Sequence, residues 1–384
     1  MRLPERSGRL LPLEALRGMA AMLVVMHHFF LGYMPALLMF TPPSGLRGLL
    51  PDSGTPLFVF VNGKAMVIIF FVLSGYVLAL KGLRPNPGRV LADAAIKRWF
   101  RFAPVVLLAL LFSYSLFALH LYRYDDAGVL NGSLWLHNFG DQPQNYVPHF
   151  SAILYEALAG CFLSGESRFD PVLWTMQIEF FGSMIVFMLA SLLPQARRGW
   201  LWLALALMAV LLYNEGQYFI PFLLGVLGAG FPLAQLRLNR IAAFLLVGIG
   251  MYFCGYYHPQ GWYGWLSFAT LPELKLRILL YTLGGFLLLL AFTTQNAVSR
   301  RFQGRASQVL GILSFPLYLL HAPILTSFCA WAFVVAGGGN AGLTAALLTF
   351  ALVATPLVWG LAKFDVCWLK VLSRWHPAGK NTPA

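Results

Sequence analysis

Charged residues are scarce in this chain. Asp, Glu, Lys and Arg make up only 11% of its 384 residues, whereas 59% are hydrophobic and the mean hydropathy is +0.71. Soluble domains carry about 25% charged residues, so the composition excludes an ordinary soluble protein and predicts an integral membrane protein. The hydrophobic runs are nearly continuous and do not alternate, which favours an all-α protein of spanning helices over a β-barrel.

Cysteine is scarce as well, and several catalytic motifs are absent. The cysteines have neither paired nor CxxC spacing, so the sequence predicts no disulfide framework and no metal site, and we interpret them as packing residues. They are Cys161, Cys254, Cys329 and Cys367. The motifs GxSxG, HExxH, Walker A and DxDxDG do not occur. The glycines of GVLGAG, residues 225–230, lie in a hydrophobic run and indicate helix packing rather than a dinucleotide loop.

Apolar runs of about 20 residues, the length that a bilayer requires, predict about ten membrane-spanning helices in a single domain, residues 1–384. The run at 200–213 is short and the turn at 214–217 is tight, so nine or fewer helices are the alternative count. The segment 123–171 is expected to face outward, as a functional loop or as a partly ordered external cap. A short cytoplasmic tail, residues 363–384, is expected to follow the last span. The expected spans are residues 16–38, 64–81, 102–122, 172–193, 200–213, 218–235, 241–257, 275–293, 309–335 and 341–362.

Basic residues outnumber acidic ones by 27 to 14, and their placement predicts the orientation of the chain. On this map, 21 of the 27 lysines and arginines fall on one side of the membrane, which the positive-inside rule assigns to the cytoplasm. Both termini are therefore expected in the cytoplasm, and the protein in the inner cell membrane. This sorting and contact with anionic membrane lipids account for the formal net charge of +13, so no nucleic-acid partner is predicted.

The first hydrophobic run contains one arginine and two histidines, in LEALRGMAAMLVVMHHFF at residues 13–30. Eleven helical steps bring His28 to within about 20° of Arg17, whereas His27 points about 80° away. Glu14, three positions before Arg17, is expected to pair with it at the cytoplasmic end. An ionisable side chain inside a membrane is costly, so His28, expected near mid-membrane, predicts a functional site. The alternative is a histidine that is merely hydrogen-bonded between helices.

The same spacing occurs in a known family. The chain resembles the membrane acyltransferase-3 family, whose first helix carries an Arg-x10-His motif that Arg17 and His28 fit. The resemblance extends over nearly the whole chain in the family's order. The further stretches that carry it are FFVLSGYVL (70–78), IKRWFRFAPV (96–105), LWTMQIEFFG (173–182) and LSFPLYLLHAPI (313–324).

The resemblance implies an O-acyltransferase that moves an acyl group, expected to be acetyl, from cytoplasmic acyl-coenzyme A to a hydroxyl of a carbohydrate or lipid-linked glycan. No permanently bound cofactor is implied, because acetyl-CoA is a substrate. His28 is expected to deprotonate the acceptor hydroxyl or to receive the acyl group itself, both of which need a neutral imidazole. Arg17 is expected to orient the donor or to stabilise negative charge on the thioester oxygen.

The basic cluster Lys97, Arg98 and Arg101 is interpreted as a donor site. Arg98 and Arg101 are three positions apart and therefore share a helix face, a geometry suited to the phosphates of coenzyme A. Topological anchoring by positive charge is the alternative. Ser74 is interpreted as a helix-packing residue, and contact with the donor is the alternative.

Other polar residues of these stretches each have a structural and a functional interpretation. Glu179 is expected to orient a sugar hydroxyl or to pair with a buried base, and Trp174 opens the same helix on the acceptor side. His321 lies on a helix that is expected to kink at its prolines, one turn after Tyr318. It is expected to assist proton transfer, to line the acceptor path or to bond between helices.

Two other classes of function remain open from the sequence. A transporter of a glycan or small metabolite would use Arg17, His28 and His321 as a substrate or proton path, although the chain lacks the related halves that transporters commonly show. A membrane anchor would use the segment 123–171 for interactions. Many members of the family that the chain resembles carry a fused extracytoplasmic hydrolase-like domain. Because only the tail 363–384 follows the last expected span, such a partner is expected here to be a separate protein.

Overall fold

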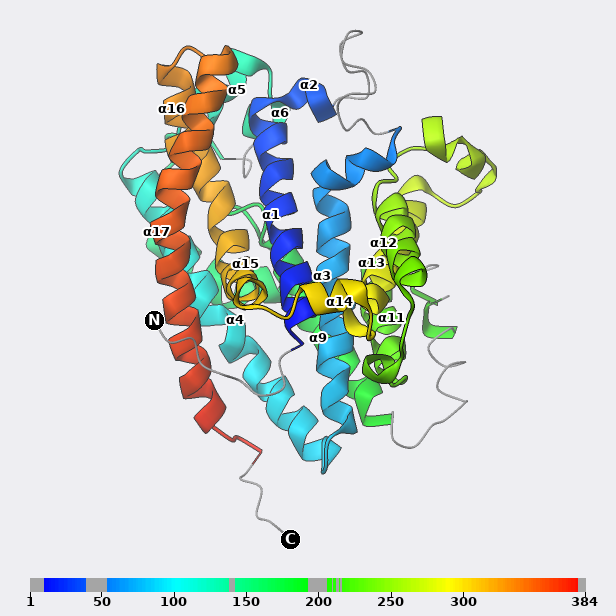
Figure 1. Cartoon of the computed structure of the whole chain (residues 1–384). Helices are drawn as coiled ribbons and strands as arrows, with labels where there is room; N and C mark the ends of the chain where they lie inside the picture. Colours follow the sequence, from blue (N-terminus) through cyan, green and yellow to red (C-terminus); the bar gives the residue numbers. More distant parts are fainter. Residues whose placement is uncertain are drawn as a thin grey trace.

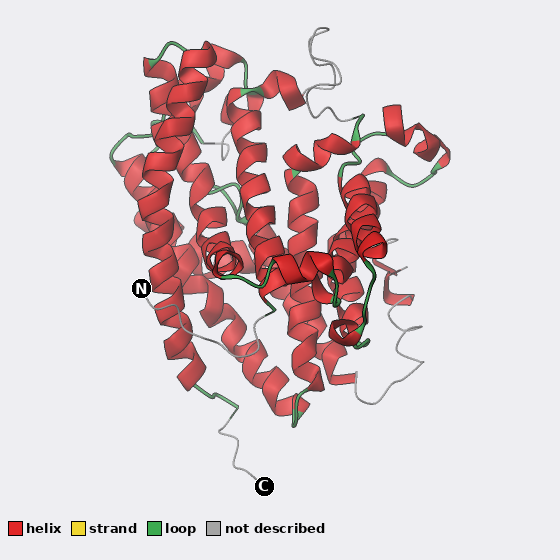
Figure 2. Cartoon of the chain, in the orientation of Figure 1, coloured by secondary structure: helices red, strands yellow, loops and turns green. Residues whose placement is uncertain are grey.

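The computed structural model describes residues 10–38, 54–137, 142–192, 206–208, 210–211, 214 and 216–378. Within these ranges the chain forms a bundle of helices, and no strand is present there (Figure 1, Figure 2). An isolated bridge between Arg237 and Gln295 is the one β-type pairing in the described part. The expectation of an all-α fold is confirmed.

Seven of the described helices are long and apolar enough to cross a membrane. They are α1 (Leu11–Tyr33), α3 (Gly63–Ala79) with the 3₁₀ turn η2 (Leu80–Leu83), α4 (Pro87–Ala118), α9 (Trp174–Leu192), α13 (Glu273–Thr293), α15 (Arg305–Ile324) with the π-helical turn η8 (Leu325–Cys329) and α16 (Ala330–Val335), and α17 (Gly339–Arg374). The chain is therefore a multi-pass membrane protein, in which seven of the roughly ten expected spans are found.

Two expected spans form helices that are too short for a straight crossing of about 20 residues. The region 218–235 contains the 3₁₀ turn η5 (Gln217–Phe219) and α11 (Ile220–Ala229), which ends before Gly230 and Pro232. The region 241–257 forms α12 (Arg240–Cys254), which has 15 residues and ends at Gly255. The expected span 200–213 lies largely outside the described residues. The connecting elements are α2 (Pro35–Leu38), η1 (Pro56–Val61), η6 (Leu233–Gln235), η7 (Gly261–Phe268) and α14 (Ala297–Arg301).

The segment 123–171, expected as an outward loop or cap, is largely helical. It begins with α5 (Tyr124–Asn131) and α6 (Leu134–His137), and continues as one apolar helix made of α7 (Phe150–Tyr155), the π-helical turn η4 (Glu156–Gly160) and α8 (Cys161–Leu163). Trp99 Nε1 of α4 donates to the Leu158 carbonyl at 2.8 Å, and Gln177 Nε2 of α9 donates to the Leu163 carbonyl at 2.8 Å. The second half of the segment therefore lies against the bundle.

Glycines bring the central helices into close contact. A Cβ at Gly18 of α1 would lie 2.5 Å from the Leu310 Cβ of α15, and a Cβ at Gly75 of α3 would lie 2.3 Å from the backbone of α11. A Cβ at Gly225 would lie 2.3 Å from the Val72 carbonyl oxygen. Only glycine permits these distances, which confirms that the GVLGAG stretch serves helix packing.

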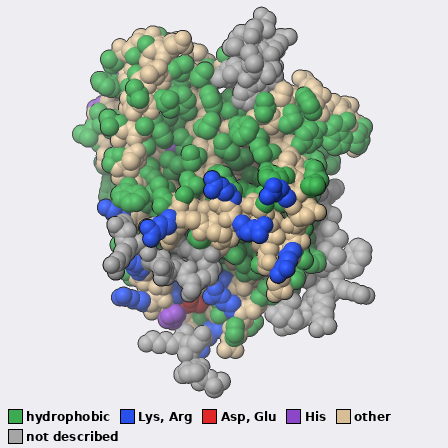
Figure 3. Space-filling model, viewed as in Figure 1, with side chains coloured by type: hydrophobic (Ala, Val, Ile, Leu, Met, Phe, Trp, Pro, Cys, Tyr) green, Lys and Arg blue, Asp and Glu red, His purple; other side chains and the backbone are tan. Residues whose placement is uncertain are grey.

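The basic side chains are distributed unevenly over the bundle. On the face drawn in Figure 3, Lys and Arg gather in the lower half, whereas the upper half is mainly hydrophobic. The start of α1 and the end of α17 both lie in this lower half (Figure 1). The asymmetry matches the expected positive side of the membrane, and its assignment to the cytoplasm stays a prediction.

Candidate active site

Two histidines from distant parts of the chain meet between α1 and α15. His28 Nδ1 lies 3.0 Å from His321 Nε2, and the two ring centroids are 4.9 Å apart. His28 lies five positions before the end of α1, about 7.5 Å along the helix, and is thus nearer the helix end than the expected mid-membrane position. The difference arises because α1 runs from Leu11 to Tyr33, five residues earlier than the expected span 16–38.

Backbone carbonyls determine which ring nitrogens carry protons. His28 Nδ1 lies 3.0 Å from the Val24 carbonyl oxygen, and His321 Nδ1 lies 3.2 Å from the Leu317 carbonyl oxygen. Since a carbonyl oxygen only accepts, we assign the proton of each neutral ring to Nδ1. His321 Nε2 then accepts from His28 Nδ1–H. No group in the described part of the chain bonds to His28 Nε2, so this nitrogen can accept a proton.

Aromatic rings border the histidine pair. The Trp135 ring of α6 is centred 5.2 Å from that of His28, and the Tyr318 ring is centred 5.8 Å from that of His321. The Tyr318 hydroxyl lies 2.9 Å from Thr175 Oγ1 of α9, which holds the tyrosine in place. The sequence gives no signal for Trp135, because a single aromatic residue outside a long apolar run has no periodicity.

His27 contacts a different neighbour. Its Nδ1 donates to the Val61 carbonyl at 2.7 Å, and its ring packs on Gly63, where a Cβ would come within 2.6 Å of the ring. His27 therefore ties α1 to the start of α3, whereas His28 faces α15. The two adjacent histidines thus have separate surroundings.

Arg17 also contacts α15, below the histidine pair. Its Nε donates to Ser314 Oγ at 3.1 Å, and its Nη2 forms the expected ion pair with Glu14. Ser314 precedes His321 by seven positions, about 10 Å along α15. Arg17 and His28 therefore share the α15 side of α1 without direct contact. The Arg17 side chain is 43% exposed.

A buried ion pair joins α4 to α9. The side chains of Arg98 and Glu179 form a salt bridge and are each 12% exposed. Ser74 of α3 donates to the Glu179 carboxylate, and Arg98 Nε donates to Ser183 Oγ at 2.7 Å. These bonds offset the cost of taking two charges out of water. Glu179 is thus the partner of a buried base, and Ser74 bonds across a helix interface.

The other cations of the predicted donor site are paired as well. Arg101 donates to both carboxylate oxygens of Asp365 in α17, at 2.5 and 3.1 Å, and Lys97 Nζ lies 2.7 Å from Asp93. Arg98 and Arg101 consequently attach α4 to two different helices. To bind phosphate, each would have to exchange its carboxylate partner.

Trp174 lies at the start of α9, beside the Tyr218 ring, with the two centroids 5.5 Å apart. The two aromatic residues border a narrow cavity of about 20 Å³, together with Lys64 and Arg277. This cavity has room for about one water molecule, and Lys64 and Arg277 are the charged residues of its lining.

Two acids of the segment 123–171 are fully buried, although nothing in the sequence marked them as special. The Glu156 carboxylate accepts from the backbone N–H groups of Arg168 and Phe169 at 3.1 and 3.2 Å. Burial raises the pKa of Glu156 to about 7, against the lowering effect of those two bonds. Burial also raises the pKa of Asp170 well above its usual range, and Asp170 Oδ2 has no partner within the described residues.

The described residues contain no group of three His, Cys, Asp or Glu side chains that could hold a metal ion. The four cysteines are free. Cys161, Cys254 and Cys329 are buried, as packing residues are expected to be, whereas Cys367 is exposed and the packing interpretation is wrong for it.

The fold and this geometry define a multi-pass helical membrane protein with a histidine pair between its first helix and α15. A family model described as an acyltransferase domain matches residues 11–363, from the start of α1 into α17. The chain therefore belongs to the membrane acyltransferase-3 family. Comparison with curated proteins and with solved structures gives no match. Membership of the family supports acyl transfer as the activity.

Proposed function

We propose that this protein transfers an acetyl group from cytoplasmic acyl-coenzyme A to a hydroxyl of a carbohydrate or lipid-linked glycan, in the inner cell membrane. The family match supports acyl transfer, and the donor and acceptor classes follow from the resemblance. The observation that carries the proposed chemistry is the His28–His321 contact, which leaves His28 Nε2 as an available acceptor.

In the proposed reaction, His28 Nε2 removes the proton of the acceptor hydroxyl while the hydroxyl oxygen attacks the thioester carbon. A C–O bond forms and the C–S bond breaks. His28 then returns the proton to the departing thiolate, so that coenzyme A leaves as a thiol. His321 Nε2 accepts a hydrogen bond from His28 Nδ1–H, and this bond strengthens when the imidazolium forms. His321 is therefore a positioning residue that acts through His28.

A covalent route would use the same atoms. His28 Nε2 would attack the thioester, release coenzyme A and hold the acyl group until the acceptor hydroxyl removes it. The two routes differ when donor is supplied without acceptor, because only the covalent route then accumulates an acylated protein. Rapid mixing with radiolabelled acetyl-coenzyme A, followed by a quench, measures this difference.

The remaining site residues have supporting roles in the proposal. Arg17 orients the donor or stabilises charge on the thioester oxygen from the far side of the substrate. The carboxylate partners of Arg98 and Arg101 favour a structural role for both residues over direct phosphate binding. Trp174, beside a cavity lined by cations, lines the path of the acceptor. Tyr318 positions His321 by packing against it.

The proposal is tested with purified protein in detergent, acetyl-coenzyme A and a carbohydrate acceptor. Acceptor-dependent release of the coenzyme A thiol, lost in His28→Ala with donor binding retained, is the expected result. Substrate-dependent flux into proteoliposomes without thioester cleavage would instead identify a transporter and overturn the proposal.

A further inference from the structure

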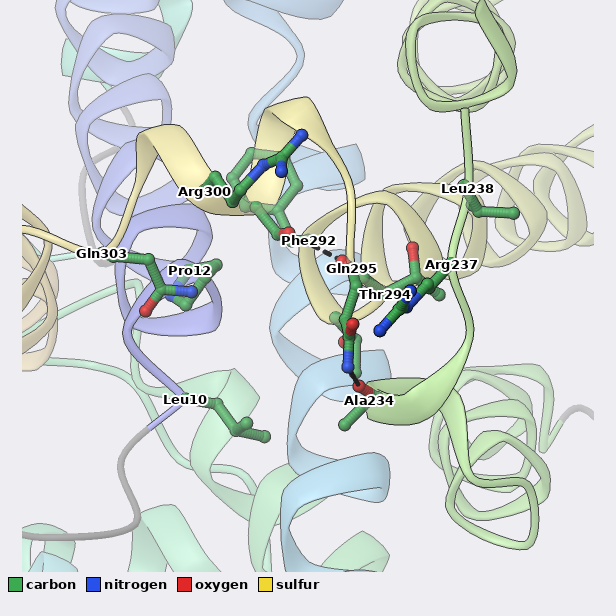
Figure 4. A pocket seen from close by; sticks show the side chains of 12 residues that line it. Leu10, Pro12, Ala234, Arg237, Leu238, Phe292, Thr294, Gln295, Arg300 and Gln303 are labelled. Carbon is green, nitrogen blue, oxygen red and sulfur yellow. Dashed lines mark hydrogen bonds between the residues drawn. The ribbon is translucent and has the colours of Figure 1, made fainter. Parts of the chain in front are cut away.

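A pocket of about 630 Å³ lies at the lower end of α1, where the start of that helix meets the end of α13 and α14 (Figure 4). In Figure 4, Leu10, Pro12 and Gln303 border it on the left, Arg237 lies on the right and Arg300 lies above. Ligand pockets have volumes of about 300–1,000 Å³, so this one is large enough for a substantial part of a cofactor-sized molecule. The reaction proposed at His28 leaves the pocket without a role.

The arginines of this pocket differ from those inside the bundle. Arg17, Arg98 and Arg101 each form an ion pair. Arg237 and Arg300 are exposed, and no carboxylate of the described residues pairs with either of them. The lining of the pocket contains no acidic residue. Two arginines without an acid create a positive potential that attracts an anion.

The fold places both arginines before any ligand binds. The chain that carries Arg237 is tied to the end of α13, because Leu238 N donates to the Gln295 carbonyl at 3.1 Å and Gln295 N donates to the Leu236 carbonyl at 2.8 Å. Arg300, on α14, follows Gln295 by only five positions. Both cations are therefore attached to one backbone unit, so an anion that binds between them has to order their side chains but not the backbone.

The pocket lies at the start of α1, whereas the proposed reaction site lies near the end of that helix. Leu10 precedes Arg17 by seven positions and His28 by 18, about 10 Å and about 27 Å along the helix axis. A ligand that occupies the pocket and reacts at His28 must be long and must carry its reactive group at the far end.

We propose that this pocket binds the phosphate-bearing nucleotide end of the acyl donor. The inference rests on the proposed function, in which the donor is an acyl-coenzyme A. The guanidinium groups of Arg237 and Arg300 pair with phosphate oxygens. Gln303 offers an amide for hydrogen bonds, the Gln295 amide oxygen can accept one while its N–H bonds to the Ala234 carbonyl, and Phe292, stacked on Phe302, adds an apolar part to the lining. The acyl-bearing arm extends from the pocket past Arg17 toward His28.

The test compares Arg237→Gln/Arg300→Gln with a matched control, Arg240→Gln/Arg301→Gln, which changes two exposed arginines outside the pocket lining. Binding of coenzyme A is measured by titration calorimetry in an uncharged detergent without added lipid. We expect the dissociation constant to rise at least tenfold in the pocket variant and to stay unchanged in the control. An unchanged constant in the pocket variant overturns the inference.

A shortened donor distinguishes this effect from damage to the fold and from failure of the proposed function. S-acetylpantetheine lacks the nucleotide, so its turnover should be equal in the wild type and in the pocket variant. A loss of that turnover would show a general defect and overturn the inference. If the wild type transfers acetyl from neither donor, yet the pocket variant binds coenzyme A tenfold more weakly than the control, the proposed function fails and the pocket assignment stands.

An anionic lipid headgroup offers the same phosphate chemistry as the donor. Native mass spectrometry after reconstitution with phosphatidylcholine, with or without phosphatidylglycerol, measures retention of the anionic lipid. If the pocket variant loses retained phosphatidylglycerol but binds coenzyme A like the wild type, the pocket is a lipid site and the inference is overturned. Loss of coenzyme A affinity with lipid retention unchanged supports it.

Discussion

His28 Nδ1 and His321 Nε2 lie 3.0 Å apart, although 293 positions separate the two residues in the chain. Taken alone, each histidine could serve as a hydrogen-bonding residue between helices. Together they form one unit in which the His28 Nδ1–H is shared between the Val24 carbonyl oxygen and His321 Nε2. The contact therefore favours a chemical role for His28 and makes that role dependent on α15.

His28→Ala is expected to abolish acyl transfer while the protein still inserts into membranes and still binds coenzyme A. Loss of a general base typically costs about 10² to 10⁴ in rate. His27→Ala is expected to retain much of the activity, because His27 bonds to the Val61 carbonyl and packs on α3, away from the pair. Release of the coenzyme A thiol per folded protein measures both variants.

The adjacent histidines serve as each other's control, since the same side chain is removed from neighbouring positions. Equal and mild defects in His27→Ala and His28→Ala would indicate that both histidines have structural roles only. Arg17→Ala is expected to be inactive too. The double variant Arg17→Ala/His28→Ala should be little worse than His28→Ala alone, because residues that act in one site are strongly non-additive.

His321→Leu is expected to lower kcat by about 10- to 100-fold with KM nearly unchanged. A hydrogen bond to a charged group contributes about 1.5–3 kcal/mol, and this one is strongest when His28 carries the extra proton. His321→Gln should recover part of the rate, because its amide oxygen can still accept from His28 Nδ1–H. Steady-state kinetics of the two variants test this, and equal rates in both would assign His321 to packing alone.

The long helices could be predicted from the sequence because length and apolar composition are local properties. The spans 218–235 and 241–257 were placed too long, since α11 stops before Gly230 and Pro232 and α12 stops at Gly255. Gly230, Pro232 and Gly255 are signals in the sequence for the end of a helix, but the apolar composition around them favoured longer spans. The helices within 123–171 could not be predicted from apolar length, because α5 and α6 are short and owe their position to contacts with the bundle.

The candidate site could likewise be predicted only in part from the sequence. The spacing of Arg17 and His28 follows from helical periodicity, and the structure places both against α15. Their partners could not be found from α1 alone. Arg98 and Arg101 of α4 indicated a phosphate site because their acids, Glu179 and Asp365, come from other helices. Neutralisation of a charge is a tertiary property, and a motif on a single helix does not contain it.

Arg98→Gln is expected to destabilise the protein by about 3–5 kcal/mol, because Glu179 then remains buried without its partner. Arg98→Gln/Glu179→Gln should recover much of this loss. Arg123→Gln, which affects a pair with both side chains well exposed, should cost no more than about 1 kcal/mol. Unfolding in detergent of the wild type, Arg98→Gln, Glu179→Gln and the double variant measures the four states of the cycle. A tenfold loss of coenzyme A affinity in the folded double variant would contradict the structural role and support phosphate binding by Arg98.

The raised pKa of Glu156 predicts that the protein loses stability as the pH rises from about 5 to about 7.5. Burial raises the pKa of this carboxyl from 4.5 to about 7 in the folded state, so the folded protein holds the proton more tightly than the unfolded chain. Below pH 4.5 both states are protonated and the group has no effect. Between the two pKa values the unfolded chain ionises first, and the stability of the fold declines until Glu156 itself ionises.

Glu156→Gln should flatten this decline, because the amide keeps an acceptor oxygen for the Arg168 or Phe169 N–H but does not ionise. Glu156→Gln should still show a residual slope, because burial also raises the pKa of Asp170. Asp126→Asn, an exposed acid of the same segment, provides the matched control and should keep the wild-type slope. The apparent Tm in detergent, followed from pH 5 to pH 8, measures all three proteins. A slope in Glu156→Gln equal to that of the wild type would show that the carboxyl is ionised throughout, held by its two backbone N–H donors, and that its burial adds no pH dependence to the fold.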